Sequence, residues 1–164
     1  MGFVRTASTL GALLLSVPAP SASAEDYRLA VGAGVFDPLG SGTTGMLSVM
    51  LEGPAVQSIW SIRPALVGFA LERSGYYLGI GGHKEFSLAQ KWHWGVATGL
   101  GYYHQGAERN ELGYDIEFYS RISISYQLSS RQAVRAEFGH ISNADLGEEN
   151  PGSETATLSW ISHF

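Results

Sequence analysis

The chain contains no cysteine and few charged residues. Without cysteine it has neither disulfides nor a thiolate metal site, which excludes the small secreted scaffolds that disulfides hold together. Charged residues make up 15% of its 164 residues, whereas soluble domains usually carry about a quarter. The net charge of −5 gives no support to a nucleic-acid partner. A chain of this length is long enough for one domain and too short for two.

The first 24 residues have the pattern of a secretory signal peptide. Arg5 supplies the positive charge, residues 10–17 form the apolar core, and residues 22–24 (Ala-Ser-Ala) form a small-residue cleavage site. The apolar core is too short to span a bilayer as an anchor. We therefore expect residues 1–24 to be removed on export, and residues 25–164 to form a single domain.

After this segment no stretch is apolar enough for a transmembrane helix, so a membrane protein with this sequence has to cross with strands. Alternation with period two recurs along the chain and predicts eight strands. They cover approximately residues 27–36, 43–52, 57–67, 76–85, 92–103, 114–128, 131–142 and 154–164, with Pro64 inside the third. Short turns alternate with longer loops, which is typical of a transmembrane barrel.

The two faces of the expected strands differ in chemistry. In residues 131–142, for example, Val134 and Phe138 share one face, while Arg135 and Glu137 share the other. A charge that faces lipid costs a few kcal/mol, so we expect the charged face to line the lumen. The side chains expected to pair there are Glu117, Arg121, Arg135 and Glu137. The predicted fold is all-β, an eight-stranded antiparallel transmembrane β-barrel of the outer-membrane type.

Aromatic residues support the membrane interpretation over its main alternative, a soluble lipocalin-like barrel with the apolar face inside. Trp92 and Tyr102 share a face ten residues apart, which on a tilted strand spans about 25 Å, the height of the apolar band between two aromatic girdles. The terminal Phe164, with Trp160 in step before it, resembles the signal by which outer-membrane barrels are recognised for assembly. Ser162 departs from that pattern, which usually has an apolar residue there.

Three polar residues with the chemistry of a catalytic triad fall on the face assigned to lipid. By parity His140 and Ser142 lie with Phe138, and Glu154 lies with Leu158 on the following strand. A serine hydroxyl becomes nucleophilic when an imidazole takes its proton, and a carboxylate orients that imidazole. The geometry alone leaves a plain alternative open, in which these are a girdle histidine, a loop-edge serine and a solvated glutamate.

The sequence around these residues resembles a known family. Residues 140–144 (His-Ile-Ser-Asn-Ala), followed by residues 150–154 (Asn-Pro-Gly-Ser-Glu), are similar to the active-site hairpin of PagL-type lipid A 3-O-deacylases. The resemblance implies His140 as general base, Ser142 as nucleophile and Glu154 as orienting carboxylate. It also implies that Asn143 and Asn150 stabilise the oxyanion or bind substrate. Asp145 stands where this family pattern leads us to expect glycine.

The resemblance implies an enzyme of the bacterial outer membrane, a serine esterase that removes the 3-O-linked hydroxyacyl chain of lipid A, the membrane anchor of lipopolysaccharide. This reaction requires no metal and no organic cofactor. Two other functions stay open, an outer-membrane esterase or phospholipase for other lipids, and a non-catalytic structural or adhesive barrel. The sequence does not decide whether two barrels pair as a homodimer.

Overall fold

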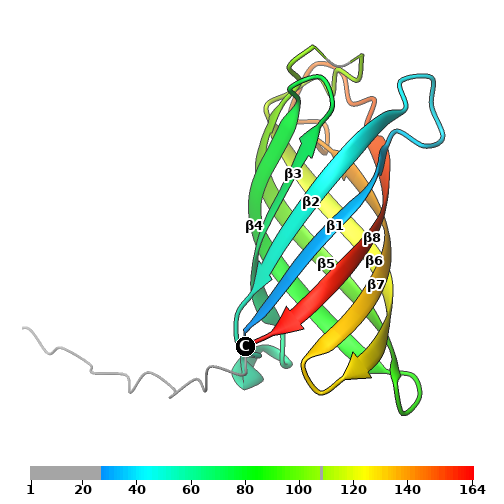
Figure 1. The fold of residues 1–164 in the computed structure, drawn as a ribbon. Helices are drawn as coiled ribbons and strands as arrows, with labels where there is room; N and C mark the ends of the chain where they lie inside the picture. The colour runs from blue at the N-terminus through cyan, green and yellow to red at the C-terminus, as the bar shows by residue number, and fades with distance from the viewer. Residues whose placement is uncertain (1–26, 108) are drawn as a thin grey trace, which may run out of the picture.

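The computed structural model describes residues 27–107 and 109–164, which form eight antiparallel strands closed into a barrel (Figure 1). Each strand pairs with the next in sequence, and β8 pairs with β1. The strands are β1 (Arg28–Phe36), β2 (Thr44–Glu52), β3 (Arg63–Leu71), β4 (Tyr76–Ser87), β5 (Trp92–His104), β6 (Ile116–Ser129), β7 (Gln132–Ser142) and β8 (Ser153–His163). This is the predicted fold class, while the expected signal peptide lies outside the described residues.

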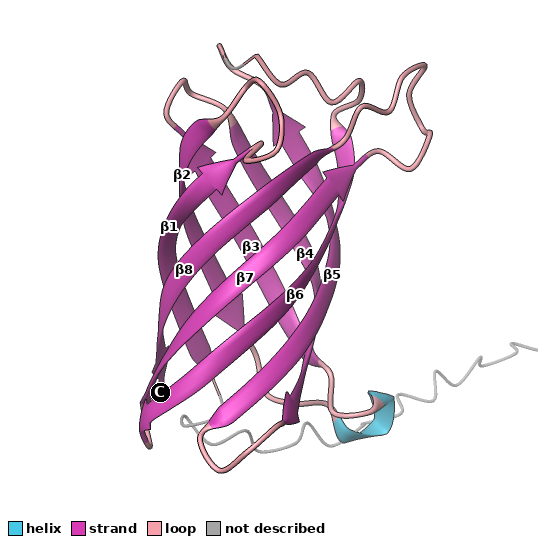
Figure 2. Cartoon of the chain, turned by 90° about the vertical axis from the view of Figure 1, so that its right-hand side faces the viewer, coloured by secondary structure: helices cyan, strands magenta, loops and turns pink. Residues whose placement is uncertain are grey.

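The two ends of the barrel carry different connections. The β4–β5 and β6–β7 turns lie at the same end as the C-terminus, which is the lower end in Figures 1 and 2. The opposite end carries the β5–β6 loop, residues 105–115, and the β7–β8 loop, residues 143–152. Across the described residues, no helix is both long enough and apolar enough to cross a membrane.

The third strand differs from its prediction. It begins at Arg63 rather than residue 57, and it runs on to Leu71. Pro64 therefore occupies the second position of the strand, where a residue without an N–H is tolerated. Residues 57–62 do not belong to the strand, because they form a short 3₁₀ helix, η2 (Gln57–Ile59), followed by Trp60 and Ser61 with positive φ.

The apolar face of the strands points outward, which excludes the lipocalin-like arrangement. Leu47, Ile122 and Leu158 expose 67%, 62% and 64% of their surface, whereas Glu52 and Arg135 on the opposite face are fully buried. An exposed apolar surface around a barrel matches the band that outer-membrane barrels present to lipid. The barrel is therefore of the transmembrane type that the sequence predicts.

The strands are tilted, so a row of paired residues climbs as it passes around the barrel. The row that starts at Trp92, the lowest residue of β5, passes through Tyr126 on β6 and Trp160 on β8. After one circuit it returns to β5 at Tyr102, near the upper end. A closed barrel requires this stagger. In the direction from β5 to β8, paired residues therefore lie progressively nearer the upper end.

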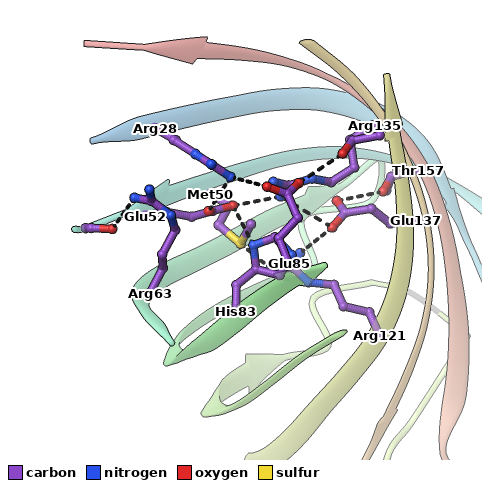
Figure 3. Close-up of polar contacts among 12 residues, drawn as sticks. Arg28, Met50, Glu52, Arg63, His83, Glu85, Arg121, Arg135, Glu137 and Thr157 are labelled. Atoms are coloured by element: carbon purple, nitrogen blue, oxygen red, sulfur yellow. Dashed lines mark hydrogen bonds and ion pairs between the residues drawn. The ribbon is translucent and has the colours of Figure 1, made fainter. Parts of the chain in front are cut away.

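Charged side chains from several strands gather inside the barrel (Figure 3). Arg135 Nη1 lies 2.7 Å from Glu52 Oε1, and His83 Nδ1 lies 3.1 Å from the same oxygen. Arg121 and Glu137 also pair inside, at 3.4 Å, as the sequence predicts. Glu117 is inside as well, but neither oxygen of its carboxyl group has a hydrogen-bond partner within the part of the chain that the structure describes, so its expected pairing is wrong.

Aromatic side chains fill the upper half of the lumen and support the loops above it. Tyr77 stacks on Phe69 with ring centroids 5.2 Å apart, and its ring lies over Gly79 and Gly101. A Cβ on Gly101 would come within 2.6 Å of this ring, so the glycine makes room for it. Leu112 of the β5–β6 loop is buried in the same cluster. Over the described residues, side chains thus pack the lumen along the length of the barrel.

Loss of the Arg135 guanidinium should destabilise the barrel, because Glu52 would be left as a buried charge with one strong partner fewer. We expect Arg135→Ala to lower the free energy of unfolding by about 3–5 kcal/mol. Urea titration of the protein folded in phospholipid vesicles, followed by tryptophan fluorescence, measures this. The control is Arg109→Ala, which removes an exposed guanidinium from the β5–β6 loop. Equal effects of the two substitutions would contradict the expectation.

Candidate active site

The hairpin formed by β7 and β8 brings His140 and Glu154 together near the upper end of the barrel. The two residues are direct partners in the antiparallel ladder. His140 Nδ1 lies 3.4 Å from Glu154 Oε1, and both side chains point outward, with 49% and 29% of their surface exposed. The register, which the sequence leaves undetermined, therefore places a carboxylate beside the imidazole. A carboxylate in this position fixes the tautomer of the ring and favours its charged form.

Ser142 is the last residue of β7 and lies on the same outward face as His140. Residues two apart on a strand are about 6.6 Å apart along its axis, so the serine and the imidazole can approach each other by side-chain rotation. Among the described residues, the Ser142 hydroxyl forms no hydrogen bond in this structure. Hydrogen bonds between a nucleophile and its base are often loose before substrate binds. The structure therefore joins two of the three predicted residues and leaves the third on the same face.

Gly152 is a functional candidate to which the sequence assigned no role. It has a φ of 60°, in the left-handed region, and a Cβ at this position would lie 2.9 Å from His140 Cε1 and 3.2 Å from Nε2. The backbone of the β7–β8 loop thus lies directly against the imidazole. Only glycine combines this backbone conformation with this approach without strain. Its place two residues before Glu154 is the one signal in the sequence that pointed to it.

The side chain of Asn143 is buried between two loops. Its Nδ2 donates to Leu112 O at 2.8 Å and to Glu149 O at 2.7 Å. Both N–H groups of the amide are therefore used within the loops. Asn143 ties the β7–β8 loop to the β5–β6 loop, and so acts on the position of the neighbouring Ser142.

Asn150, the second predicted oxyanion residue, is held in a fixed orientation at the exposed side of the loop. Its Oδ1 accepts a hydrogen bond from Asn143 N at 3.1 Å, and its Nδ2 donates to Asp145 Oδ1 at 3.1 Å. One Asn150 N–H is left for another acceptor. Asp145 has a φ of 63°, a conformation that suits the expected glycine and that aspartate tolerates better than most residues. Asp145 therefore has a backbone conformation that glycine could also adopt.

No metal centre is found within residues 27–107 and 109–164, where no three histidine, aspartate or glutamate side chains gather as ligands.

The ladder reveals another polar neighbour of the imidazole that the sequence interpretation missed. Ser120 of β6 is the direct partner of His140 on the side away from Glu154, and it is exposed on the same face. A serine among outward-facing isoleucines of this strand was the signal that could have found it.

A family model and several solved structures are similar to this chain. The model of the family described as lipid A 3-O-deacylase (PagL) matches residues 67–161. The crystal structure of the outer membrane enzyme PagL superimposes with a TM-score of 0.61 and 18% identity, over 84% of this chain and 99% of that chain. Neisserial surface protein A gives a TM-score of 0.64 and 12% identity, over 85% and 97%. At these identities the superpositions show the fold alone, and no curated protein matches the sequence.

A methyl group on Gly152 should displace the imidazole from its place beside Glu154. We expect Gly152→Ala to slow the reaction of Ser142 with a fluorophosphonate probe by tenfold or more, on the order of the loss caused by a small misplacement of a catalytic group. The rate of labelling, measured by mass spectrometry of the modified peptide, tests this. The control is Gly40→Ala in the β1–β2 loop, whose Cβ would meet only the flexible Asp37 side chain. Equal labelling of the Gly152 variant and the unmodified protein would contradict the assignment.

Proposed function

The chain belongs to the lipid A 3-O-deacylase (PagL) family of outer-membrane β-barrels, and from this premise we propose that it hydrolyses the 3-O-linked hydroxyacyl ester of lipid A. In this proposal Ser142 is the nucleophile, His140 the general base and Glu154 the orienting carboxylate. The observation that carries it is the contact between His140 and Glu154 on the outward face, 3.4 Å from Nδ1 to Oε1, with Ser142 beside them. Polar groups on a lipid-facing surface are costly and call for such a role.

The first half of the proposed reaction transfers the acyl chain to the enzyme. His140 Nε2 takes the proton from the Ser142 hydroxyl as Oγ attacks the ester carbonyl, and Glu154 stabilises the imidazolium through Nδ1. The tetrahedral intermediate collapses when the bond from the carbonyl carbon to the sugar oxygen breaks. The imidazolium returns its proton to that oxygen, which leaves as the free 3-hydroxyl of lipid A.

The second half regenerates the serine. Water attacks the acyl-enzyme carbonyl while His140 takes one of its protons, and the bond to Ser142 Oγ then breaks. The imidazolium returns the proton to Oγ, so the products are a hydroxy fatty acid and the original enzyme. The chemistry is complete with the side chains of the protein and water.

In both halves the developing oxyanion needs hydrogen-bond donors that are already in place. We assign the remaining Asn150 N–H to this role, because its orientation is fixed from both ends of the amide. Asn143 has a positioning role in this proposal, since its own N–H groups are used by Leu112 O and Glu149 O.

The position of the site supports a substrate that stays in the membrane. His140 lies eight residues above the lower end of β7, roughly 20 Å up along the membrane normal after tilt, which is near the outer-leaflet rim. In lipid A the ester carbonyls lie at the junction of sugar and acyl chains. A triad on the outside of the barrel meets this ester laterally, without extracting the lipid into a pocket.

The alternative functions predict different results in one assay. If the proposal is right, lipid A from cells that carry the protein lacks one ester-linked hydroxyacyl chain, as shown by mass spectrometry. We expect the rate of deacylation to fall by roughly 10⁴-fold or more in Ser142→Ala and in His140→Ala. Glu154→Ala should retain a rate about a hundred times higher than those two variants. Migration of the folded barrel in unheated gels checks assembly.

The matched control is Ser162→Ala, which removes an outward hydroxyl at the opposite end of β8 and should leave deacylation unchanged. Full activity of Ser142→Ala in a correctly assembled barrel would refute the triad. Unaltered lipid A together with hydrolysed phospholipid would point to an esterase for other lipids. If neither lipid changes, the chain is a structural or adhesive barrel.

A further inference from the structure

Outward-facing polar side chains occur mostly at the ends of the strands, where the membrane meets water. Lys84, Gln132 and Ser162 lie towards the lower end, and His104, Ser142 and Glu154 lie at the upper end. Thr98 at the centre of β5 and Ser120 within β6 are different, because they are exposed at the depth of apolar neighbours such as Ile122. These two hydroxyls require a separate explanation.

Both hydroxyls belong to one continuous row that includes the proposed base. Thr98 pairs with Ser120, Ser120 with His140, and His140 with Glu154. Paired residues descend from β8 towards β5, so the row runs from the rim at Glu154 down into the membrane. Ser120 is the first step below the imidazole. We name the four residues the polar row.

The Ser120 hydroxyl faces the hydrocarbon region without a hydrogen-bond partner in the part of the chain that the structure covers. A hydroxyl moved from water to an apolar phase without a partner carries a free-energy cost. A small apolar residue at this position would avoid that cost. Ala136 is such a residue on the outward face of the neighbouring strand β7. A substrate that brings a polar group to this depth would offset it.

For an ester bound at the proposed site, strand spacings favour a position of Ser120 beside the acyl chain rather than beside the ester itself. Cross-strand partners have Cα atoms about 5 Å apart, while diagonal neighbours, such as Ser120 and Ser142, are about 7–8 Å apart. An ester carbonyl held at Ser142 and His140 at the rim directs its chain downward into the bilayer. The first carbons of the chain after the carbonyl then pass Ser120, and Thr98 is one strand farther away.

We propose that Ser120 is a specificity-determining residue that hydrogen-bonds the hydroxyl group carried by the acyl chain close to the ester. An acyl chain of plain hydrocarbon offers nothing to this serine, whereas a 3-hydroxyacyl chain places its hydroxyl two carbons from the carbonyl. This inference rests on the proposed function and adds the reason why the site would favour hydroxylated chains over plain chains of equal length.

The experiment compares two synthetic lipid A analogues that carry at the 3-O position either a 3-hydroxyacyl chain or the plain acyl chain of the same length. The full-length protein, folded in detergent–phospholipid micelles, is assayed for kcat/KM on each analogue. We expect the protein to prefer the hydroxylated ester by about tenfold, the usual worth of one hydrogen bond. Ser120→Ala should lose this preference through slower hydrolysis of the hydroxylated ester alone.

Two further variants separate a specificity role from a structural one. Ser120→Thr keeps a hydroxyl and should keep the preference. Thr98→Val removes the next hydroxyl of the polar row, beyond reach of the chain's hydroxyl, and should also leave the preference intact. Migration of the folded barrel in unheated gels confirms assembly of every variant.

The outcomes distinguish this inference from the proposed function. A preference unchanged in Ser120→Ala, or absent in the unmodified protein, overturns the specificity role while leaving the esterase in place. Equal losses on both esters in Ser120→Ala also overturn it, and would assign Ser120 to the catalytic step. An unmodified protein that cleaves neither ester refutes the proposed function and this inference together.

Discussion

In a narrow transmembrane barrel each strand residue faces either hydrocarbon or a packed lumen, and both environments make an unpaired charge costly. The constraint explains the division of this chain into two chemistries. Inside, the Arg135 guanidinium and the Glu52 carboxylate pair at 2.7 Å. Outside, the strands present mostly apolar side chains, both aliphatic and aromatic. A polar residue in this outer apolar surface therefore points to a functional role, whereas a polar residue on the surface of a soluble protein does not.

The same alternation ties the proposed chemistry to the strand register. His140 and Glu154 meet because they are ladder partners on the outward face, and a slip of one residue would turn Glu154 into the lumen. The proposed general base and its carboxylate thus lie on rigid strands. The proposed oxyanion donor, Asn150, lies on the loop above, which Asn143 fixes to Leu112 of the next loop. The sheet fixes the positions of the site residues on the strands, and buried hydrogen bonds hold the loop in place beside them.

Much of this could be predicted from the sequence, because alternation is a local signal. Seven strands lie within two residues of their predicted limits, and the outward direction of His140 follows from parity alone. The third strand was predicted to begin too early, because residues 57–59 form a 3₁₀ helix and Pro64 lies near the strand's start, not in its middle. A short segment of mixed polarity has no pattern that separates a 3₁₀ turn from the start of a strand.

Features that depend on strand register or on loop packing could not be predicted from the sequence. The pairing of Ser120 with His140 requires the β6–β7 register, which no local pattern encodes. The burial of Asn143, whose Nδ2 donates to Leu112 O and Glu149 O, depends on the path of a separate loop. Glu117 likewise shared the inward face with arginines, but the stagger of the strands leaves its carboxyl group without a partner among the described residues.

The orientation of the terminal hairpin can be measured directly, because a chain without cysteine accepts single spin labels at chosen sites. Labels at residues 156 and 158 of β8 should collide freely with oxygen dissolved in the bilayer, and labels at residues 157 and 159 should be shielded in the lumen. Electron paramagnetic resonance of the protein in phospholipid vesicles gives these collision rates. The account predicts this alternation, whereas the reverse alternation would place Glu154 in the lumen and contradict the outward-facing site.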